Sequence, residues 1–338
     1  MATIKDVARL AGCSIKTVSR VINNEPYVTP ETRARVLAAI RASGYAPNLS
    51  ARRLVQNRSF SICILMYPGF YQPASQLLTR IMDIGYEENY EILIQTYFPT
   101  RVNARNKLAE LVNERRYDGF ITTPPCDADG FVADLLQTYK IPLVQVNPLD
   151  RSSSIPYVAG EDYRGAYQMT EYLISLGHCR ISFLRGPRNM RSSFDRLDGF
   201  HAALQAHGLT ADPSLEIDTE FTFDGGYWAT RLLLQRPDMP TAIYAGNDEA
   251  AFGALFALQE AGRRVPEQVS VCGHDDLLFS KYVFPGLTTV HQPSEQIVEQ
   301  AVRLLIGILK GSAPQNTQVI IPSHIVVRHS TASPPHSN

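Results

Sequence analysis

From residue 61 onward, short apolar runs alternate with longer stretches that have apolar residues at helical spacing. The runs that predict strands are 62–66, 91–97, 119–123, 141–146, 181–184, 242–245 and 269–272. The stretches that predict helices include 74–90, 105–115, 167–176 and 250–261. Strands that alternate with helices indicate parallel sheets built from right-handed crossovers. Because some 270 residues exceed what one such core usually holds, we expect two α/β lobes with a cleft between them.

The first 44 residues follow another pattern, in which short helical stretches are separated by tight breaks. Thr3 precedes an acidic residue by three positions, the spacing of a capping box at the start of a first helix. Gly12 interrupts this helix, and Ser14 can cap a second one. Thr29 can cap a third helix, which ends at Gly44. Three helices this short form a bundle whose main use is to present a surface.

The basic residues are concentrated at the N-terminal end of the chain. Residues 1–60 contain ten Lys and Arg against three Asp and Glu, a net charge of +7, although the whole chain carries only −1. The remaining residues therefore carry −8. A basic segment joined to an acidic one indicates an anionic polymer as the partner of the basic segment alone. On charge alone, a solvated charged face remains the alternative.

Four small or branched residues in the basic segment have the spacing of a helix-turn-helix: Ala8, Gly12, Val18 and Val21. A small residue is needed where the two helices touch, and glycine where the turn requires a positive φ. The branched residues anchor the second helix. The motif predicts a DNA-binding surface.

Other classes of protein lack support in the sequence. No basic stretch followed by an apolar run opens the chain, and no run reaches the length of a membrane span. The five cysteines are scattered, as in proteins with reduced thiols, so we expect a cytoplasmic protein. The acidic pair after His274 could suggest catalysis, but no metal-binding cluster, nucleophile elbow or phosphate loop accompanies it. We expect no enzyme activity, no metal and no cofactor.

Two longer runs, 3–23 and 45–54, closely resemble the LacI/GalR family of bacterial transcriptional regulators, and the resemblance extends to about residue 330. It implies a small all-α helix-turn-helix domain at 1–46 and a hinge helix or linker at 47–60. It further implies a two-lobed α/β effector-binding and dimerisation domain at 61–331, like periplasmic binding proteins. Lobe 1 would comprise about 61–159 and 291–321, lobe 2 about 162–288 and 322–331, and residues 332–338 a disordered tail. A secreted sugar-binding protein would share the two lobes but would lack the basic segment.

The resemblance assigns DNA contacts mainly to the second helix, which would enter the major groove. Ile15, Lys16 and Arg20 stand at the base-reading positions. Residues assigned to phosphate contacts or to the rest of the DNA surface are Thr3, Ser14, Thr17, Ser19, Asn23, Thr32, Asn48 and Arg52. Ala51 and Leu54 stand where the family inserts a wedge into the minor groove, which unstacks and bends DNA.

The resemblance also assigns an effector site at the ends of the predicted strands, where loops converge on a cleft in open α/β sheets. Arg196, Asn247, Asp275 and Gln292 supply the polar contacts that a sugar requires, and Phe221 would stack on the ligand. The remaining assigned residues are Tyr71, Gln72, Pro73, Asn147 and Ser192. For Ser192 and Gln72, a purely structural role is equally open. Asn147 and His274 depart from the acidic and aromatic residues usual in the family, so the identity of the effector is left undetermined.

These assignments predict a repressor that binds a palindromic operator as a homodimer. The tail after Val327 has two prolines and no leucine heptads, so it cannot build a tetramer-forming helical bundle. We expect a small-molecule inducer, a sugar or sugar derivative, to release the operator. A corepressor such as a purine, which would instead strengthen operator binding, is the alternative.

Overall fold

The computed structural model describes residues 2–22, 27–45, 58–67, 75–114 and 116–335. The chain divides into two compact units, Met1–Phe60 and Ser61–Asn338, which we call the head and the body. Of the residues assigned to DNA contacts, Asn23, Asn48, Ala51, Arg52 and Leu54 lie outside the described residues. Tyr71, Gln72 and Pro73 of the effector assignment also lie outside them.

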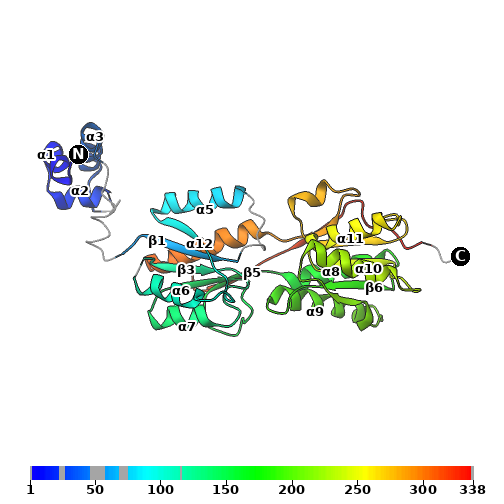
Figure 1. Ribbon diagram of the computed structural model, residues 1–338. Helices are drawn as coiled ribbons and strands as arrows, with labels where there is room; N and C mark the ends of the chain where they lie inside the picture. The colour runs from blue at the N-terminus through cyan, green and yellow to red at the C-terminus, as the bar shows by residue number, and fades with distance from the viewer. Residues whose placement is uncertain (1, 23–26, 46–57, 68–74, 115, 336–338) are drawn as a thin grey trace. The chain divides into compact units, whose positions relative to one another are not determined.

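The head is a three-helix bundle with a very small core (Figure 1). Its helices are α1 (Ile4–Ala11), α2 (Ile15–Ile22) and α3 (Pro30–Ser43). The predicted helix ends at Gly12 and Gly44 are present, and both glycines have φ of 61°. The predicted cap is present as well, since the Ser14 hydroxyl accepts a hydrogen bond from the Thr17 backbone N–H at 3.1 Å. The buried residues shared by the three helices are Val7, Ala8, Ala11, Val18, Val21, Val36 and Ala39. So few apolar side chains leave little reserve of stability.

The first lobe of the body contains a six-stranded parallel sheet. Its strands are β1 (Ser61–Met66), β2 (Glu91–Thr96), β3 (Gly119–Thr122), β4 (Leu143–Val146), β5 (Tyr157–Gly160) and β11 (Gln318–Ile321), in the order β11-β5-β4-β3-β1-β2. Helices α5 (Ser75–Glu88) and α12 (Ser294–Lys310) cover one face, and α6 (Ala104–Asn113) and α7 (Phe131–Thr138) the other (Figure 1). The sheet therefore recruits its last strand from near the C-terminus.

The second lobe repeats this arrangement with a sheet ordered β12-β10-β9-β8-β6-β7. Its strands are β6 (Ile181–Arg185), β7 (Glu216–Asp218), β8 (Ala242–Ala245), β9 (Ser270–Asp275), β10 (Thr288–His291) and β12 (His324–Val326). Only β12 runs antiparallel to its neighbour among the described strands. Helices α8 (Asp162–Ser175) and α9 (Arg191–Ala206) pack together, as do α10 (Phe223–Leu234) and α11 (Asp248–Glu260). The expected pair of α/β lobes is confirmed.

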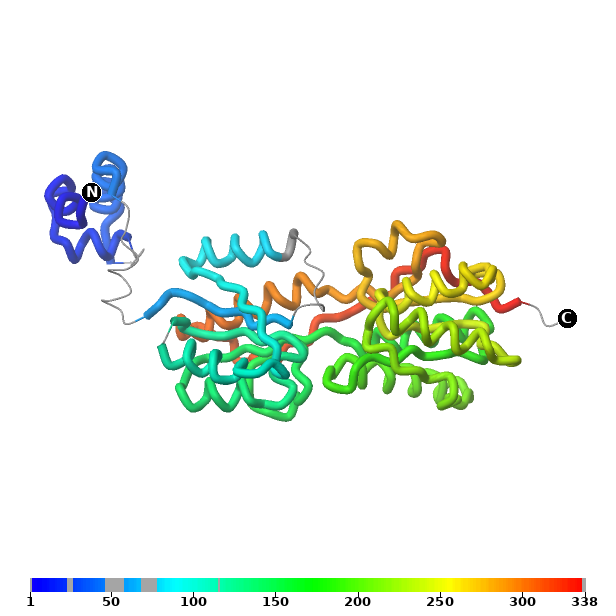
Figure 2. Tube along the Cα trace, viewed as in Figure 1, coloured from blue at the N-terminus to red at the C-terminus, as the bar shows by residue number. Residues whose placement is uncertain are grey.

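The chain passes between the lobes after β5, after β10 and after β11 (Figure 2). Short 3₁₀ helices occur at Pro213–Leu215 and at Leu278–Lys281, the latter labelled η2. Among the described residues, none of the helices has the length and apolar character that a membrane crossing requires.

The ordered chain extends further than the sequence predicted. The backbone N–H of Ala332 donates to the Ser270 hydroxyl at 3.0 Å, and the Ala332 carbonyl accepts from that hydroxyl at 3.0 Å. The Ala332 carbonyl also lies 2.9 Å from Nε2 of the buried His178. The expectation of a disordered tail from residue 332 is therefore wrong for Ala332, because these hydrogen bonds fix it to the second lobe.

Candidate functional site

Arg196 is the centre of a buried network in the second lobe. Helix α9 places this side chain, only 4% exposed, among groups from three other segments. Its guanidinium donates to Asp162 Oδ1 at 2.8 Å, to Asp275 Oδ1 at 2.9 Å and to the Gly246 carbonyl at 2.6 Å. Burial alone would lower the pKa of Arg196, but the two carboxylates hold it above its usual range. The arginine is therefore a fixed cation that orients both carboxylates.

Asp275 ends β9 in a backbone conformation that is unusual for a residue with a side chain, with φ of 119°. Burial raises its pKa to about 6, although the charge of Arg196 opposes the shift. Two other carboxylates, Asp162 and Glu249, raise it as well. A carboxylate with a strained backbone and a raised pKa at a strand end is typical of a binding site.

Asp162 belongs to this network and was not predicted. Its side chain is fully buried, and Oδ1 also accepts from Gln292 Nε2 at 3.0 Å. A Cβ at residue 160 would lie 2.3 Å from Gln292 Oε1, so any residue larger than glycine there would displace the Gln292 amide. Asp162 Oδ2, Gln292 Oε1 and His274 Nε2 are buried without a hydrogen-bond partner in the described part of the chain. Unpaired buried polar atoms are costly, so this cluster suits a polar ligand or water.

Asn247 holds the loop around Phe221 in place through hydrogen bonds to backbone groups. Asn247 caps α11 by accepting from the Ala250 N–H at 3.0 Å, and its amide donates to the Phe221 carbonyl at 3.0 Å. Phe221 has φ of 57°, and its ring lies 5.4 Å from the Arg196 guanidinium carbon. The ring fills the space that a Cβ at Gly186 would occupy, only 2.1 Å from the nearest ring carbon. Both Asn247 groups are thus engaged in holding the loop that presents Phe221.

The surroundings of His274 favour the neutral imidazole. It is fully buried, and burial together with the nearby Arg196 lowers its pKa well below the usual value. The Tyr244 hydroxyl lies 3.0 Å from Nδ1, and Nε2 lies 3.6 Å from Asp162 Oδ1. His274 Nε2 therefore lies near Asp162 without forming a hydrogen bond to it.

The other assigned residues are less closely connected to Arg196. In the first lobe, Asn147 has φ of 45°, and its side-chain oxygen accepts from the Gly160 N–H at 2.9 Å. It borders a small cavity of about 20 Å³ together with Asn189 of the second lobe. Ser192 is 7% exposed on α9, one turn before Arg196. Among the described residues, no group of three His, Cys, Asp or Glu side chains could hold a metal ion.

The head presents the start of α2 to solvent. Ser14 and Lys16 are exposed, and the Ile15 side chain is 44% exposed, which is unusual for isoleucine. Thr17 is only partly exposed, and its hydroxyl lies 2.9 Å from that of Ser14. Beyond α2, Thr3 donates to the Asp6 carboxylate and Thr32 N–H donates to the Thr29 hydroxyl, so both predicted residues stand at helix starts. Ser19 and Arg20, the remaining described residues of this surface, are partly buried on α2.

Two family models match the chain. The model for bacterial regulatory proteins of the lacI family matches residues 3–48, and that for a periplasmic binding protein-like domain matches residues 170–331. The ribose operon repressor of Escherichia coli (strain K12) is 34% identical over 309 residues, covering 90% of this chain and 92% of that protein. The HTH-type transcriptional repressor PurR of Haemophilus influenzae is 31% identical over 337 residues, covering 98% of this chain and 99% of that protein.

A solved structure of the lac repressor dimer, bound to operator and the anti-inducer ONPF, has the same fold as this chain. The two superpose with a TM-score of 0.79 at 27% sequence identity, and the match covers 98% of this chain and 99% of that one. The similarity therefore includes both the head and the body.

Proposed function

Since this chain belongs to the lacI family of bacterial regulatory proteins, we propose that it is a repressor whose hold on a palindromic operator is released by a small polar effector. The observation that carries this proposal is the buried Arg196 network, in a unit separate from the DNA-binding head. Such a regulator works where the chromosome is, so we place it in the cytoplasm. We assign it no catalytic activity.

The site favours a sugar or sugar derivative as the inducer. Asp275, Arg196 and Gln292 combine acceptors with donors, as vicinal hydroxyl groups require, and Phe221 adds an apolar face. One relative is named as a ribose operon repressor. A corepressor with a planar ring is the second candidate, supported by the Phe221 ring and by the likeness to a repressor named PurR. Titrating sugars and nucleosides into the protein–operator complex separates the two, because an inducer weakens DNA binding and a corepressor tightens it.

We further propose that the protein binds DNA as a homodimer joined along the body. Large apolar side chains are exposed on α10, α11 and the η2 segment: Trp228, Leu232, Phe256, Leu278, Phe279, Tyr282 and Phe284. Exposed apolar groups at this density suit burial against a second copy. The similar lac repressor is a dimer in its operator complex.

The operator should be a palindrome of about 14–20 base pairs, because a two-fold dimer places one α2 helix on each half-site. We expect a central CG step, since pyrimidine–purine steps unstack at low energetic cost around a Leu54 wedge.

Lys16→Ala should relax the preference at one symmetric pair of positions by about 1–3 kcal/mol, because Lys16 can donate to guanine O6 and N7. Arg52→Ala, in contrast, should weaken binding to all sequences alike. Selection of sites from a random DNA pool checks this; a direct repeat, or a Lys16→Ala profile identical to the parent's, would contradict it.

Effector binding should weaken in acid. If ligand hydroxyls donate to the ionised Asp275, whose pKa is about 6, protonation of that carboxylate competes with the ligand. Affinity should then be constant above about pH 7 and should fall about tenfold per pH unit well below pH 6. Isothermal titration calorimetry between about pH 5 and pH 8 measures this. Asp275→Asn is the control: its weaker binding should lose the pH dependence, and an unchanged slope would assign the titration to another group.

A further inference from the structure

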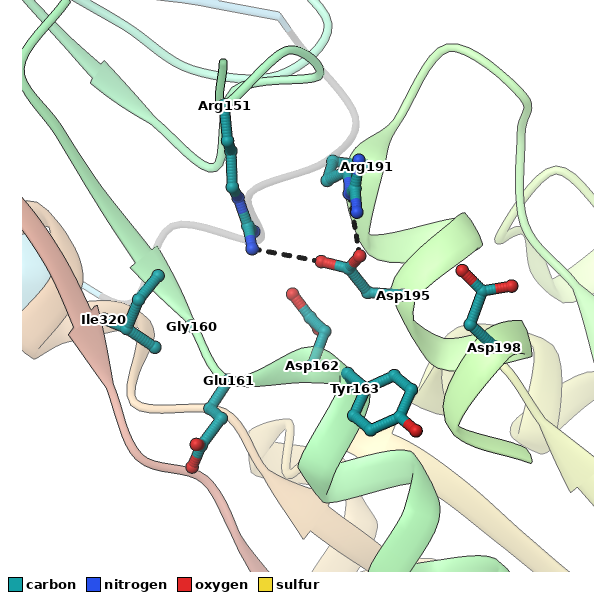
Figure 3. Close-up of a pocket in the computed structure, with 9 residues that line it drawn as sticks. All are labelled: Arg151, Gly160, Glu161, Asp162, Tyr163, Arg191, Asp195, Asp198 and Ile320. Atoms are coloured by element: carbon teal, nitrogen blue, oxygen red, sulfur yellow. Dashed lines mark hydrogen bonds and ion pairs between the residues drawn. The ribbon is translucent and has the colours of Figure 1, made fainter. Parts of the chain in front are cut away.

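Different side chains surround the three connections between the lobes. At the connection after β5, the Asp195 carboxylate lies 3.1 Å from Arg151 Nη1 of the first lobe and 2.7 Å from Arg191 Nε (Figure 3). The connections after β10 and after β11 instead meet two histidines, because His291 is the last residue of β10 and His324 is the first residue of β12. An ion pair thus supports the first connection, whereas a histidine pair lies at the other two.

The two histidines face each other across neighbouring strands. His291 and His324 are direct partners in the antiparallel pairing of β10 with β12. Directly opposite residues project from the same face of a sheet, and the centroids of these two rings are 4.9 Å apart. Strand β12 is at the edge of its sheet, His324 is exposed, and the His291 side chain is 38% exposed. A dissolved ion can therefore reach both rings.

Asp276 fixes the orientation of the His291 ring. Its Oδ2 lies 3.0 Å from His291 Nδ1, and because a carboxylate accepts hydrogen bonds, Nδ1 carries the proton. Arg328 holds the same carboxylate from its other side, since Nη2 donates to Oδ1 at 2.5 Å. A neutral ring with its proton on Nδ1 has its lone pair on Nε2. Carboxylates prepare the histidine ligands of metal ions in this way.

The His324 ring is available as a second ligand. Its side chain makes no hydrogen bond or ion pair within the described chain. Two imidazoles on one ion would have centroids about 4.5–5 Å apart, because each nitrogen lies about 2 Å from the ion and the two bonds enclose about 90–110°. The observed separation of 4.9 Å falls in this range. Imidazole nitrogens suit zinc, copper and nickel ions, whereas magnesium and calcium prefer oxygen.

We propose that His291 and His324 bind a divalent transition-metal ion of the zinc, copper and nickel group. Nε2 of His291 and a ring nitrogen of His324 hold the ion. No third His, Cys, Asp or Glu side chain joins them among the described residues, so water completes the coordination. No metal was expected from the sequence, because the pairing of β10 with β12, and not spacing along the chain, brings the two histidines together.

A bound ion would join the second-lobe ends of two connections to the first lobe. It ties the edge strand β12 to β10 at the pair where both strands meet these connections. An ion that binds only the folded chain stabilises it, so zinc should raise the melting temperature of the body. The site uses none of the residues assigned to the effector, and it does not depend on the proposed repressor function.

The test is calorimetry on the full chain with Zn²⁺ as the probe. We expect one zinc ion per chain, and magnesium should not compete for the site. His291→Asn and His324→Asn should each weaken zinc binding about tenfold or more, because loss even of a residue that only orients a ligand costs this much. The melting temperature of the double variant should not respond to zinc. Absence of zinc binding at submillimolar concentrations would overturn the proposal.

His207→Asn is the matched control. This histidine of the second lobe is also partly exposed, with Nε2 3.7 Å from a Glu171 carboxylate oxygen, but no second histidine faces it among the described residues. The variant should bind zinc like the parent. If His291→Asn and His324→Asn also bind zinc like the parent, the ion lies elsewhere and the assignment fails. Operator binding in the presence of a chelator should be that of the parent in all variants, so failure of the metal site leaves the proposed repressor function standing.

Discussion

Arg196→Ala is expected to abolish the response to the effector and to lower the free energy of unfolding of the body by about 3–5 kcal/mol. The substitution leaves the buried Asp162 and the partly exposed Asp275 without their cation, and the Gly246 carbonyl loses its donor. Urea denaturation measures the stability, and effector titration of the operator complex measures the response. Without effector, operator affinity should stay near that of the parent, because the head is a separate compact unit.

Arg188→Ala is the matched control. Its side chain is 80% exposed, and its ion pair with Asp218 is 3.8 Å long, so neither stability nor response should change measurably. The assignment of Arg196 is wrong if effector affinity in Arg196→Ala stays within about threefold of the parent, a difference well below 1 kcal/mol.

Val18→Asp is expected to remove operator binding while leaving effector binding intact. Val18 is completely buried in the head, whose core has seven buried residues. Burying an unpaired charge there costs more free energy than the folding of so small a bundle provides. The head should then be unfolded, and operator affinity should fall about a hundredfold or more. Electrophoretic mobility shift with operator DNA measures this, and calorimetry with the effector reports on the body.

Leu37→Asp adds the same charge at a position on α3 that is 41% exposed. It should keep a folded head and lose affinity only through one added negative charge near DNA, about tenfold at most. Equal losses in Val18→Asp and Leu37→Asp would mean that charge, and not the core, determines the effect.

Periodicity predicted most of the architecture but passed over several strands. All seven apolar runs contain a strand, because most of them are buried on both faces of a parallel sheet. The edge strand β2 is the exception, with only Ile92 buried. In contrast, β10 was missed because it begins with two buried threonines. Their hydroxyls are satisfied from distant parts of the chain: Thr289 by Asp248 at 2.6 Å and Thr288 by Thr331 at 3.0 Å. A strand with buried hydroxyl groups is stable only because these partners exist. The hydropathy of a single sequence gives no information about such distant partners.

The same limit applies to the site. Arg196, Asp275 and Gln292 were selected through family motifs, and the structure brings them together around one carboxylate. That carboxylate, Asp162, was missed because its partners lie 34 and 130 residues away. Its position two residues after the short strand β5 was the available signal, since the ends of parallel strands face the cleft.

The late position of β11 has a consequence for biosynthesis. The first lobe starts to emerge from the ribosome at Ser61. Helix α12 and strand β11, which pack on and beside its sheet, are translated only after every strand of the second lobe except β12. Until then the β5 edge, with Val158 and Ala159 fully buried in the finished protein, has no neighbour on that side. An unpaired apolar edge of a nascent chain can pair wrongly or recruit a chaperone. The lobe that begins first thus cannot be completed until Ile321 has been added.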